Sequence, residues 1–353
     1  MRTAPDRHRT WLDWGVVVAV SVGGGWLLGR IGVPSGYLFA ALLTGLAYAL
    51  RAPGRLMLPG FGFQVGQAVT GVALGTFLQA GVLTGLGTRW IPVILVSVAT
   101  LAVTIGAGIV LARVTSLDRP TASLGMVAGG ASGIVAMASD LGADDRLVAF
   151  MQYLRVLIIT LLTPLLVPIV FGLHAQSVAQ DSEPLLGTAA GWGLTIAAPI
   201  AGSLLARPLR IPAPTLLGPL LLTAVLTLSG AIGDTQVPPL AREIAFALIG
   251  LRIGLGFDRE AVRRIARMAW RVALAIAALL AVCFVLGWLL ELTAGVSLLD
   301  GYLATTPGGL YAVLPIAYGS GADTTFVLAV QGLRLFGMII AAPVVVRFLL
   351  RGR

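Results

Sequence analysis

Two stretches of this sequence, GADDRLVAFMQYLRVLIITLLTP (142–164) and GADTTFVLAVQGLRLFGMIIAAP (321–343), align without a gap. Their identical pairs, each 179 residues apart, are Gly142/Gly321, Ala143/Ala322, Asp144/Asp323, Val148/Val327, Gln152/Gln331, Leu154/Leu333, Arg155/Arg334 and Pro164/Pro343. Several matched residues are polar although they lie inside apolar runs, so shared hydrophobicity does not explain them. The sequence therefore predicts an internal duplication, with one membrane repeat at 1–180 and the other at 181–353.

The composition points to a membrane protein. Of 353 residues, 58% are hydrophobic and 11% are charged, and the mean hydropathy is +0.96, whereas soluble domains have about 45–50% apolar and about 25% charged residues. The excess lies in runs of about the 20 residues that cross a bilayer, at 14–31, 90–112, 148–171, 187–206, 269–290 and 326–348. We expect an all-α polytopic membrane protein.

Each half is predicted to contain six helical elements. We expect them near 14–31, 36–50, 62–81, 90–112, 121–139 and 147–172, and again near 186–206, 214–233, 241–257, 268–291, 299–319 and 325–350. The fifth element differs from the others, because SLGMVAGGASGIVAMAS (123–139) and YLATTPGGLYAVLPIAYGSG (302–321) contain glycine and proline breaks. Such breaks at membrane depth are tolerated where protein or a water-filled cavity surrounds them.

The arginines indicate how the elements cross the membrane. All 24 basic residues are arginine and the formal net charge is +9. If all twelve elements crossed, the cluster at 259–267 would lie opposite the basic N-terminal tail, against the positive-inside rule. If each broken element re-enters, most arginines and both termini lie on the cytoplasmic side. We therefore expect two inverted repeats of about five spans each plus one broken or re-entrant helix per repeat (10–12 transmembrane segments); a parallel twelve-span arrangement is the alternative.

The broken elements are the first candidate for a binding site. A break exposes half-helix ends, whose unpaired N–H and C=O groups bind ions without a side-chain charge. Ser132, Thr305 and Thr306 add hydroxyl groups. The predicted substrate-binding residues of the breaks are Gly129, Gly130, Ser132, Gly133, Thr305, Thr306, Pro307, Gly308 and Gly309. The alternative is that these glycines only allow close helix packing.

The sixth elements carry a second set of polar candidates. Asp144 and Asp323 begin these elements, and are either N-caps or ligands of a coupling ion. Arg155 and Arg334 follow about 16 Å further along on the same helix face, with Gln152 and Gln331 one turn before them. An arginine this deep in a membrane indicates function, or a structural pairing with carbonyl ends. Arg252, which has no counterpart in the first half, is a further candidate for binding an anion.

Other classes of function are disfavoured. The chain has two histidines, a single cysteine (Cys283) and no cluster with metal-ligand spacing. No phosphate-binding loop is present. We therefore expect no enzyme activity, no metal, no cofactor and no nucleic-acid partner.

The motifs IPAPTLLGPLL (211–221), ALIGLRIGLGF (247–257), TTPGGLYAVLPIAYGSGAD (305–323) and the duplicated Gln-x-x-Arg resemble the AbrB-type bacterial inner-membrane proteins. This family resembles the cation–proton antiporter and anion transporter superfamily, whose inverted repeats carry broken helices. Its members are also labelled as regulators of gene expression or as ammonia monooxygenases. The first copy departs from the pattern, with Ala128 and Gly36 where the second has Pro307 and Pro214.

Together the residues and the resemblance predict a secondary transporter of a small, anionic solute that works by alternating access. The expected partners are the lipid bilayer, the solute, H⁺ or Na⁺ as the coupling ion, and a second copy in a homodimer. The resemblance implies a multi-pass location in the bacterial cytoplasmic (inner) membrane. The alternative is a membrane protein that regulates gene expression through a partner or indirectly.

Overall fold

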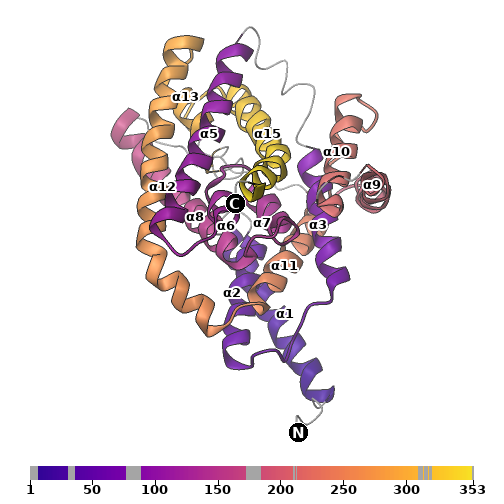
Figure 1. Cartoon of the computed structure of the whole chain (residues 1–353). Helices are drawn as coiled ribbons and strands as arrows, with labels where there is room; N and C mark the ends of the chain where they lie inside the picture. The colour runs from indigo at the N-terminus through magenta and orange to yellow at the C-terminus, as the bar shows by residue number, and fades with distance from the viewer. Residues whose placement is uncertain are drawn as a thin grey trace.

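The computed structural model describes residues 7–30, 36–76, 89–171, 184–209, 211, 213–308, 313, 317 and 320–351; at 160, 161, 164, 165, 168 and 347–351 it describes the backbone alone. Within these residues the fold is helical and contains no strand. The elements are α1 (Arg7–Arg30), α2 (Gly36–Arg51), α3 (Gly60–Gly75), α5 (Trp90–Val114), α6 (Arg119–Met126), α7 (Ala131–Ala138), η1 (Ser139–Leu141), α8 (Asp145–Phe171), α9 (Ala189–Ala206), α10 (Pro214–Leu228), α11 (Pro239–Leu255), α12 (Arg259–Ala294), α13 (Leu298–Thr305) and α15 (Thr324–Arg351) (Figure 1).

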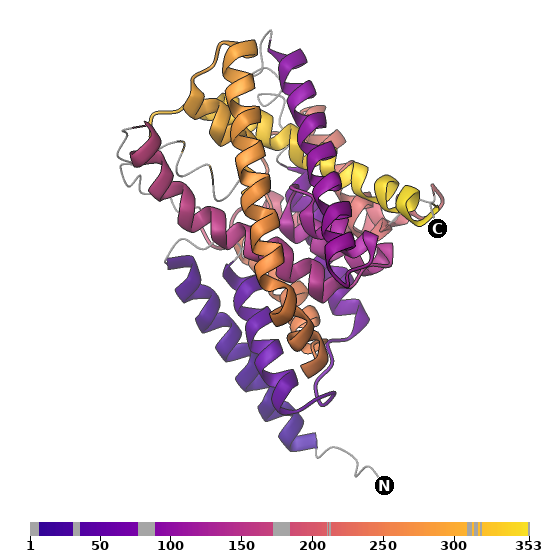
Figure 2. The ribbon, with the colours of Figure 1, turned by 60° about the vertical axis from the view of Figure 1, so that its left-hand side comes forward.

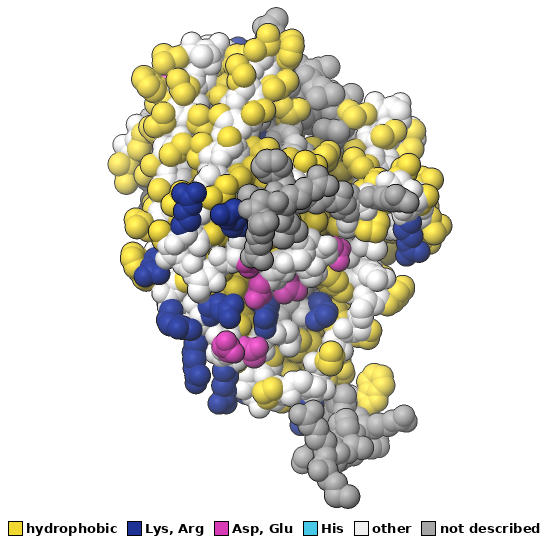
Figure 3. Space-filling view, in the orientation of Figure 1, with side chains coloured by type: hydrophobic (Ala, Val, Ile, Leu, Met, Phe, Trp, Pro, Cys, Tyr) yellow, Lys and Arg dark blue, Asp and Glu magenta, His cyan; other side chains and the backbone are white. Residues whose placement is uncertain are grey.

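The predicted membrane class is supported by helix length and composition. Five helical segments in the described residues are long and apolar enough to cross a bilayer: Trp11–Arg30, Trp90–Val114, Ala189–Ala206, Arg259–Ala294 and Thr324–Val346. Their outward faces carry large exposed side chains such as Trp26, Leu95 and Leu204, as expected for helices whose outer face is solvated by lipid. Figure 3 shows this apolar surface over α5 and α12, with arginines gathered below it.

The helices form two bundles, and each bundle combines both halves of the sequence. The first bundle consists of α1, α2 and α3 packed with α9, α10 and α11, and the second consists of α5 to α8 packed with α12, α13 and α15. In Figure 2 the long helices α5 and α12 run alongside one another, apart from α1 and α2. Thus the first three elements of both halves share one bundle, and the last three elements share the other.

Close approaches between helices recur at matching positions of the two halves. A Cβ atom on Gly71 of α3 would overlap the carbonyl oxygen of Leu216 in α10, and a Cβ on Gly250 of α11 would overlap that of Leu38 in α2. Gly71 and Gly250 are 179 residues apart, as are Gly108 and Gly287, which approach α6 and α13 respectively. The duplicated glycines therefore allow equivalent helix pairs to pack with their backbones in contact.

The predicted elements agree with the observed helices except at some boundaries. The element expected at 268–291 begins nine residues earlier, at Arg259, so the arginine cluster lies on a helix instead of a loop. Asp258 starts this helix because its carboxylate accepts a 2.7 Å hydrogen bond from the Ala261 amide. That bond is the main cause of a pKa for Asp258 below its usual range. The predicted repeat boundary near 180 lies outside the described residues and stays a prediction.

Candidate functional site

The first broken element ends α6 at Met126 and restarts as α7 at Ala131. Gln152 of α8 donates through Nε2 to the carbonyl oxygens of Leu124 (2.6 Å) and Val127 (2.9 Å). Arg155 donates through Nη1 to Met126 (3.1 Å) and Val127 (3.0 Å), and through Nη2 to Gln152 Oε1 (2.6 Å). We call this arrangement the Gln-x-x-Arg clamp. It satisfies the carbonyl groups that a helix leaves unpaired at its C-terminal end.

The second half repeats this clamp at positions 179 residues later. Gln331 of α15 donates to the carbonyl oxygens of Leu303 (2.7 Å) and Thr306 (3.0 Å) at the end of α13. Arg334 donates to Thr305 (2.6 Å), Thr306 (2.8 Å) and Ala304 (3.3 Å), and to Gln331 Oε1. The same two side chains therefore hold the same half-helix end in each half.

Both clamps are buried and positively charged. Gln152, Arg155, Gln331 and Arg334 have exposed fractions of 0%, 2%, 2% and 3%. Neither guanidinium forms a salt bridge with a carboxylate of the described residues, and the Nε of each has no hydrogen-bond acceptor there. The two guanidinium groups also lie close enough to repel one another. Since each helix end contributes about −0.5 charge, about one positive charge remains uncompensated.

The amino end of α7 lies on the other side of the first break. Gly130, its N-cap, has φ +49, a left-handed conformation that glycine adopts readily, and no side chain caps the helix. Ser132 and Gly133 are buried in its first turn. A Cβ on Gly130 would lie 3.0 Å from Ile339 of α15, so this helix end faces the opposite half, one turn beyond Arg334. The break thus places N–H groups near the second clamp.

The same cross-packing occurs at the second break. A Cβ on Gly129 would meet Met338, and a Cβ on Gly308 would meet Ile159, each pair again 179 residues apart. Pro307 is buried in the second break. Gly309, the last of the predicted site residues there, lies outside the described residues. The structure therefore brings the two breaks and the two clamps together, each break lying against the sixth helix of the other half.

The threonine hydroxyls predicted to bind the solute have backbone partners. Thr305 Oγ1 donates to the carbonyl oxygen of Cys283 (2.8 Å), and Thr306 Oγ1 donates to that of Tyr302 (2.7 Å). Threonine in a helix commonly bonds the preceding turn in this way. These hydroxyl protons are thus occupied inside the protein.

The aspartates lie at the far ends of α8 and α15 from the clamps. Asp323 accepts a hydrogen bond from the Phe326 amide (3.0 Å), and Asp144 accepts one from the Arg146 amide (3.1 Å) while pairing with the Arg146 side chain. Both therefore have capping geometry, and the coupling-ion role stays a prediction. Arg252 ends α11, where its charge acts on Asp145 instead of the breaks.

A polar bridge that the repeat does not indicate joins the two bundles. Gln67 of α3 donates through Nε2 to Ala136 O (2.6 Å) and to the Asp140 carboxylate (3.0 Å), and its Oε1 accepts from the Thr215 hydroxyl of α10 (2.7 Å). The matching positions in the other half are Phe246, Gly319 and Tyr37. The duplication signal could not find this bridge, because only one half contains it.

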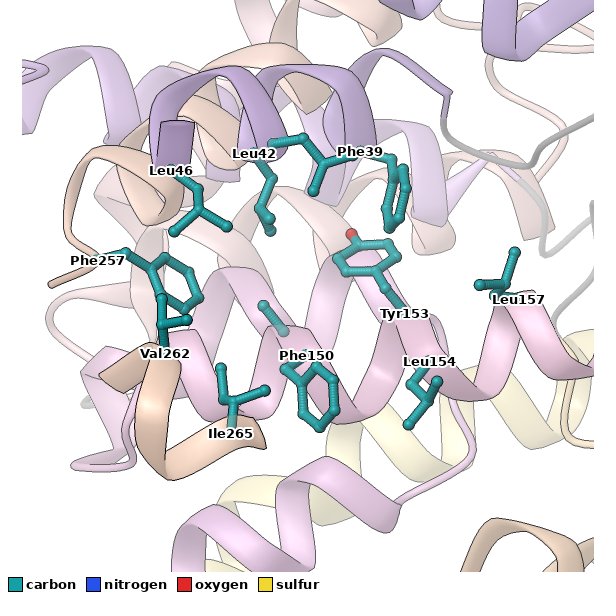
Figure 4. Close-up of a pocket in the computed structure, with 12 residues that line it drawn as sticks. Phe39, Leu42, Leu46, Phe150, Tyr153, Leu154, Leu157, Phe257, Val262 and Ile265 are labelled. Carbon is teal, nitrogen blue, oxygen red and sulfur yellow. The ribbon is translucent and has the colours of Figure 1, made fainter. Parts of the chain in front are cut away.

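Two apolar crevices lie between the bundles at matching places. The first is formed by α2, α8 and the start of α12 and has a volume of about 230 Å³ (Figure 4). The second is formed by α10, α15 and α5 and has a volume of about 610 Å³. Their walls correspond through the repeat, in the pairs Leu43/Leu221, Leu46/Ala224, Leu154/Leu333 and Leu157/Phe336. Across the described residues no cluster of histidine, cysteine or carboxylate side chains could hold a metal.

The helices and the buried clamps define a polytopic α-helical membrane protein with a duplicated broken helix. The chain belongs to the AbrB family, because the family model "Transition state regulatory protein AbrB" matches residues 37–350. It is 36% identical over 343 residues to "Putative regulator AbrB" of Escherichia coli (strain K12), covering 96% of this chain and 97% of that protein. It is 27% identical over 360 residues to "Uncharacterized protein YhjN" of Bacillus subtilis (strain 168), covering 94% and 92% respectively. The predicted family resemblance is confirmed.

Proposed function

We propose that this protein is a secondary transporter of a small anionic solute, and that its two halves are inverted repeats whose bundles move against one another in alternating access. The observation that carries the proposal is the pair of buried guanidinium groups at the breaks. A buried cation without a carboxylate partner is costly in a membrane protein and indicates a functional role. The uncapped amino end of α7 adds further positive potential nearby. The centre between the halves is therefore suited to an anion.

The arrangement of the halves supports the same proposal. Interrupted helices within inverted repeats are typical of secondary transporters, whose site lies at the repeat interface. Here each break packs against the other half, and each crevice has a counterpart at the matching position. The distribution of arginine favours inversion with both termini cytoplasmic in the bacterial inner membrane. H⁺ or Na⁺ is the proposed coupling ion, with Asp144 and Asp323 as its candidate ligands.

Thiol labelling tests this proposal without knowledge of the solute. Cys283 is the single cysteine of the chain, so Cys283→Ala provides a cysteine-free background. In that background Leu46→Cys and Ala224→Cys place one thiol in each crevice at matching positions. A membrane-impermeant maleimide should label the two from opposite sides of oriented vesicles. Labelling of both from the same side, or of neither from any side in folded protein, would contradict alternating access.

The name of the Escherichia coli relative supports a second candidate, a membrane protein that alters gene expression. The crevice-filling change Leu46→Trp separates the two functions in a deletion strain. If transport underlies any expression change, this variant should lose solute uptake and the expression effect together. An expression effect that persists without uptake would instead favour regulation through a partner.

A further inference from the structure

The two crevices have apolar walls, and each wall carries one polar group with spare hydrogen-bonding capacity. In the first crevice this group is the Tyr153 hydroxyl, which is buried and has no partner among the described residues. The Tyr153 ring packs edge-on against Phe39, with 5.9 Å between centroids. Figure 4 shows the hydroxyl pointing toward Leu42 and Phe39. The first crevice is therefore a hydrophobic space with a single hydrogen-bonding group.

In the second crevice the polar group is Arg334. Its Nη atoms are occupied by the clamp, whereas its buried Nε–H has no acceptor among the described residues. Ser97, the other polar residue on this wall, already donates its hydroxyl proton to Val93 O (2.7 Å). A full positive charge therefore borders a cavity that is otherwise apolar.

These walls discriminate between classes of solute. A short hydrophilic anion would lose its hydration against leucine and phenylalanine side chains, and one donor would not replace that hydration. An apolar chain, in contrast, is stabilised by the surface it buries there. Sites of this kind use a few polar groups to orient a mostly apolar ligand.

We propose that the transported solute is an amphipathic organic anion, with the chemistry of a medium-chain carboxylate. Its apolar body lies against α5 and α10 in the second crevice and against α2 and α12 in the first. Its anionic group meets Arg334 Nε–H in the second crevice and the Tyr153 hydroxyl in the first. This inference rests on the proposed transport function, since it treats the two crevices as the two ends of one pathway.

The test is a chain-length series on the full protein in lipid nanodiscs, with binding to empty nanodiscs subtracted. Butyrate, hexanoate, octanoate and decanoate are compared with decanol. We expect affinity to rise about three- to fourfold for each added methylene group that fits. Decanol should bind at least tenfold more weakly than decanoate. Tyr153→Phe, which keeps the ring, should weaken decanoate binding about two- to tenfold.

Two tryptophan variants of α2 provide a matched control. Leu46 lines the first crevice, whereas Ala47 lies on the exposed face of the same helix. Leu46→Trp should abolish decanoate binding at the first crevice, and Ala47→Trp should leave the affinity unchanged. Both variants are compared only where their melting temperatures match that of the parent chain, and Tyr153→Phe is the alternative if Leu46→Trp does not fold.

Three results would overturn the inference. The first is an affinity that does not change with chain length, or that is highest for butyrate. The second is equal binding of decanol and decanoate with no effect of Tyr153→Phe, which would make the crevices grooves for lipid tails. The third is equal loss of binding in both tryptophan variants. If the thiols at positions 46 and 224 are still labelled from opposite sides, the transport function survives each of these results; same-side labelling removes both proposals.

Discussion

The two Gln-x-x-Arg clamps and the two crevices evolved from the same duplication but differ in how much of it they retain. In the clamps, Gln152 and Arg155 make nearly the same contacts as Gln331 and Arg334. In the crevices, Tyr153 has glycine at its matching position and Leu46 has alanine. The clamps meet a backbone requirement, since both half-helices end in unpaired carbonyl groups. The crevice walls meet no such requirement, so they were free to diverge.

The largest expected effect removes the shared clamp. Arg155→Met and Arg334→Met should each lower the free energy of unfolding by about 3 kcal/mol or more, because buried carbonyl groups lose a charged donor. The corresponding lysine variants should rescue little, since an ammonium group cannot reproduce the planar fork. Thermal unfolding in one detergent measures all four variants. If one arginine could be replaced without loss, the two clamps would not be equivalent.

A second comparison concerns the duplicated glycines. Gly71→Ala and Gly250→Ala should each destabilise the protein by about 1–3 kcal/mol, because the new methyl group overlaps a carbonyl oxygen of the facing helix. Gly193→Ala in α9 is the control, since nothing lies within 4 Å of its added Cβ. Denaturation midpoints that fell as far for Gly193→Ala as for the other two would show that packing is not the cause.

The bridge that only one half contains should give a smaller effect. Gln67→Leu should cost about 1–2 kcal/mol, because the Thr215 hydroxyl loses its acceptor and Asp140 loses a donor. A double-mutant cycle with Thr215→Val measures the coupling, which we expect to be about 0.5–1.5 kcal/mol. Additive single effects would mean that Gln67 acts through Asp140 and Ala136 alone.

The smallest effect is expected at the helix caps. Asp323→Ala should cost about 1 kcal/mol through loss of the bond to the Phe326 amide. Asp144→Ala should cost slightly more, since Asp144 also pairs with the partly exposed Arg146. Asn at either position should restore most of the stability, because an amide oxygen still caps. If Asn failed where it caps well, the carboxylate charge itself would be required, as the coupling-ion hypothesis expects.

The sequence predicted the parts of the structure that depend on local pattern. The breaks at Gly129–Gly130 and after Thr305 follow from glycine and proline, and the helices follow from apolar runs. The position of Gln152 and Arg155 on one face of α8 follows from helical periodicity. Among the alternatives for the arginines, pairing with carbonyl ends has the geometry that the structure describes.

Other features could not be predicted because they depend on contacts between distant segments. The exchange of helices between halves is set by which glycine face meets which partner, and a single sequence does not specify that choice. Tyr153 and Gln67 lack a counterpart in the other half, so no repeat signal marks them. The start of α12 was predicted too late because its first turns are polar and are stabilised by the Asp258 cap instead of an apolar run.

The sharing of each bundle by both halves has a consequence for biosynthesis. The glycine face of α3 packs against α10, and α2 packs against α11, so these helices emerge from the ribosome well before their partners. Residues 71 and 216 are separated by a delay on the order of ten seconds at ordinary rates of translation. During that delay the newly inserted α2 and α3 remain in the bilayer with unfilled glycine grooves. The nascent chain is therefore exposed to membrane chaperones and quality-control proteases until its second half has been made.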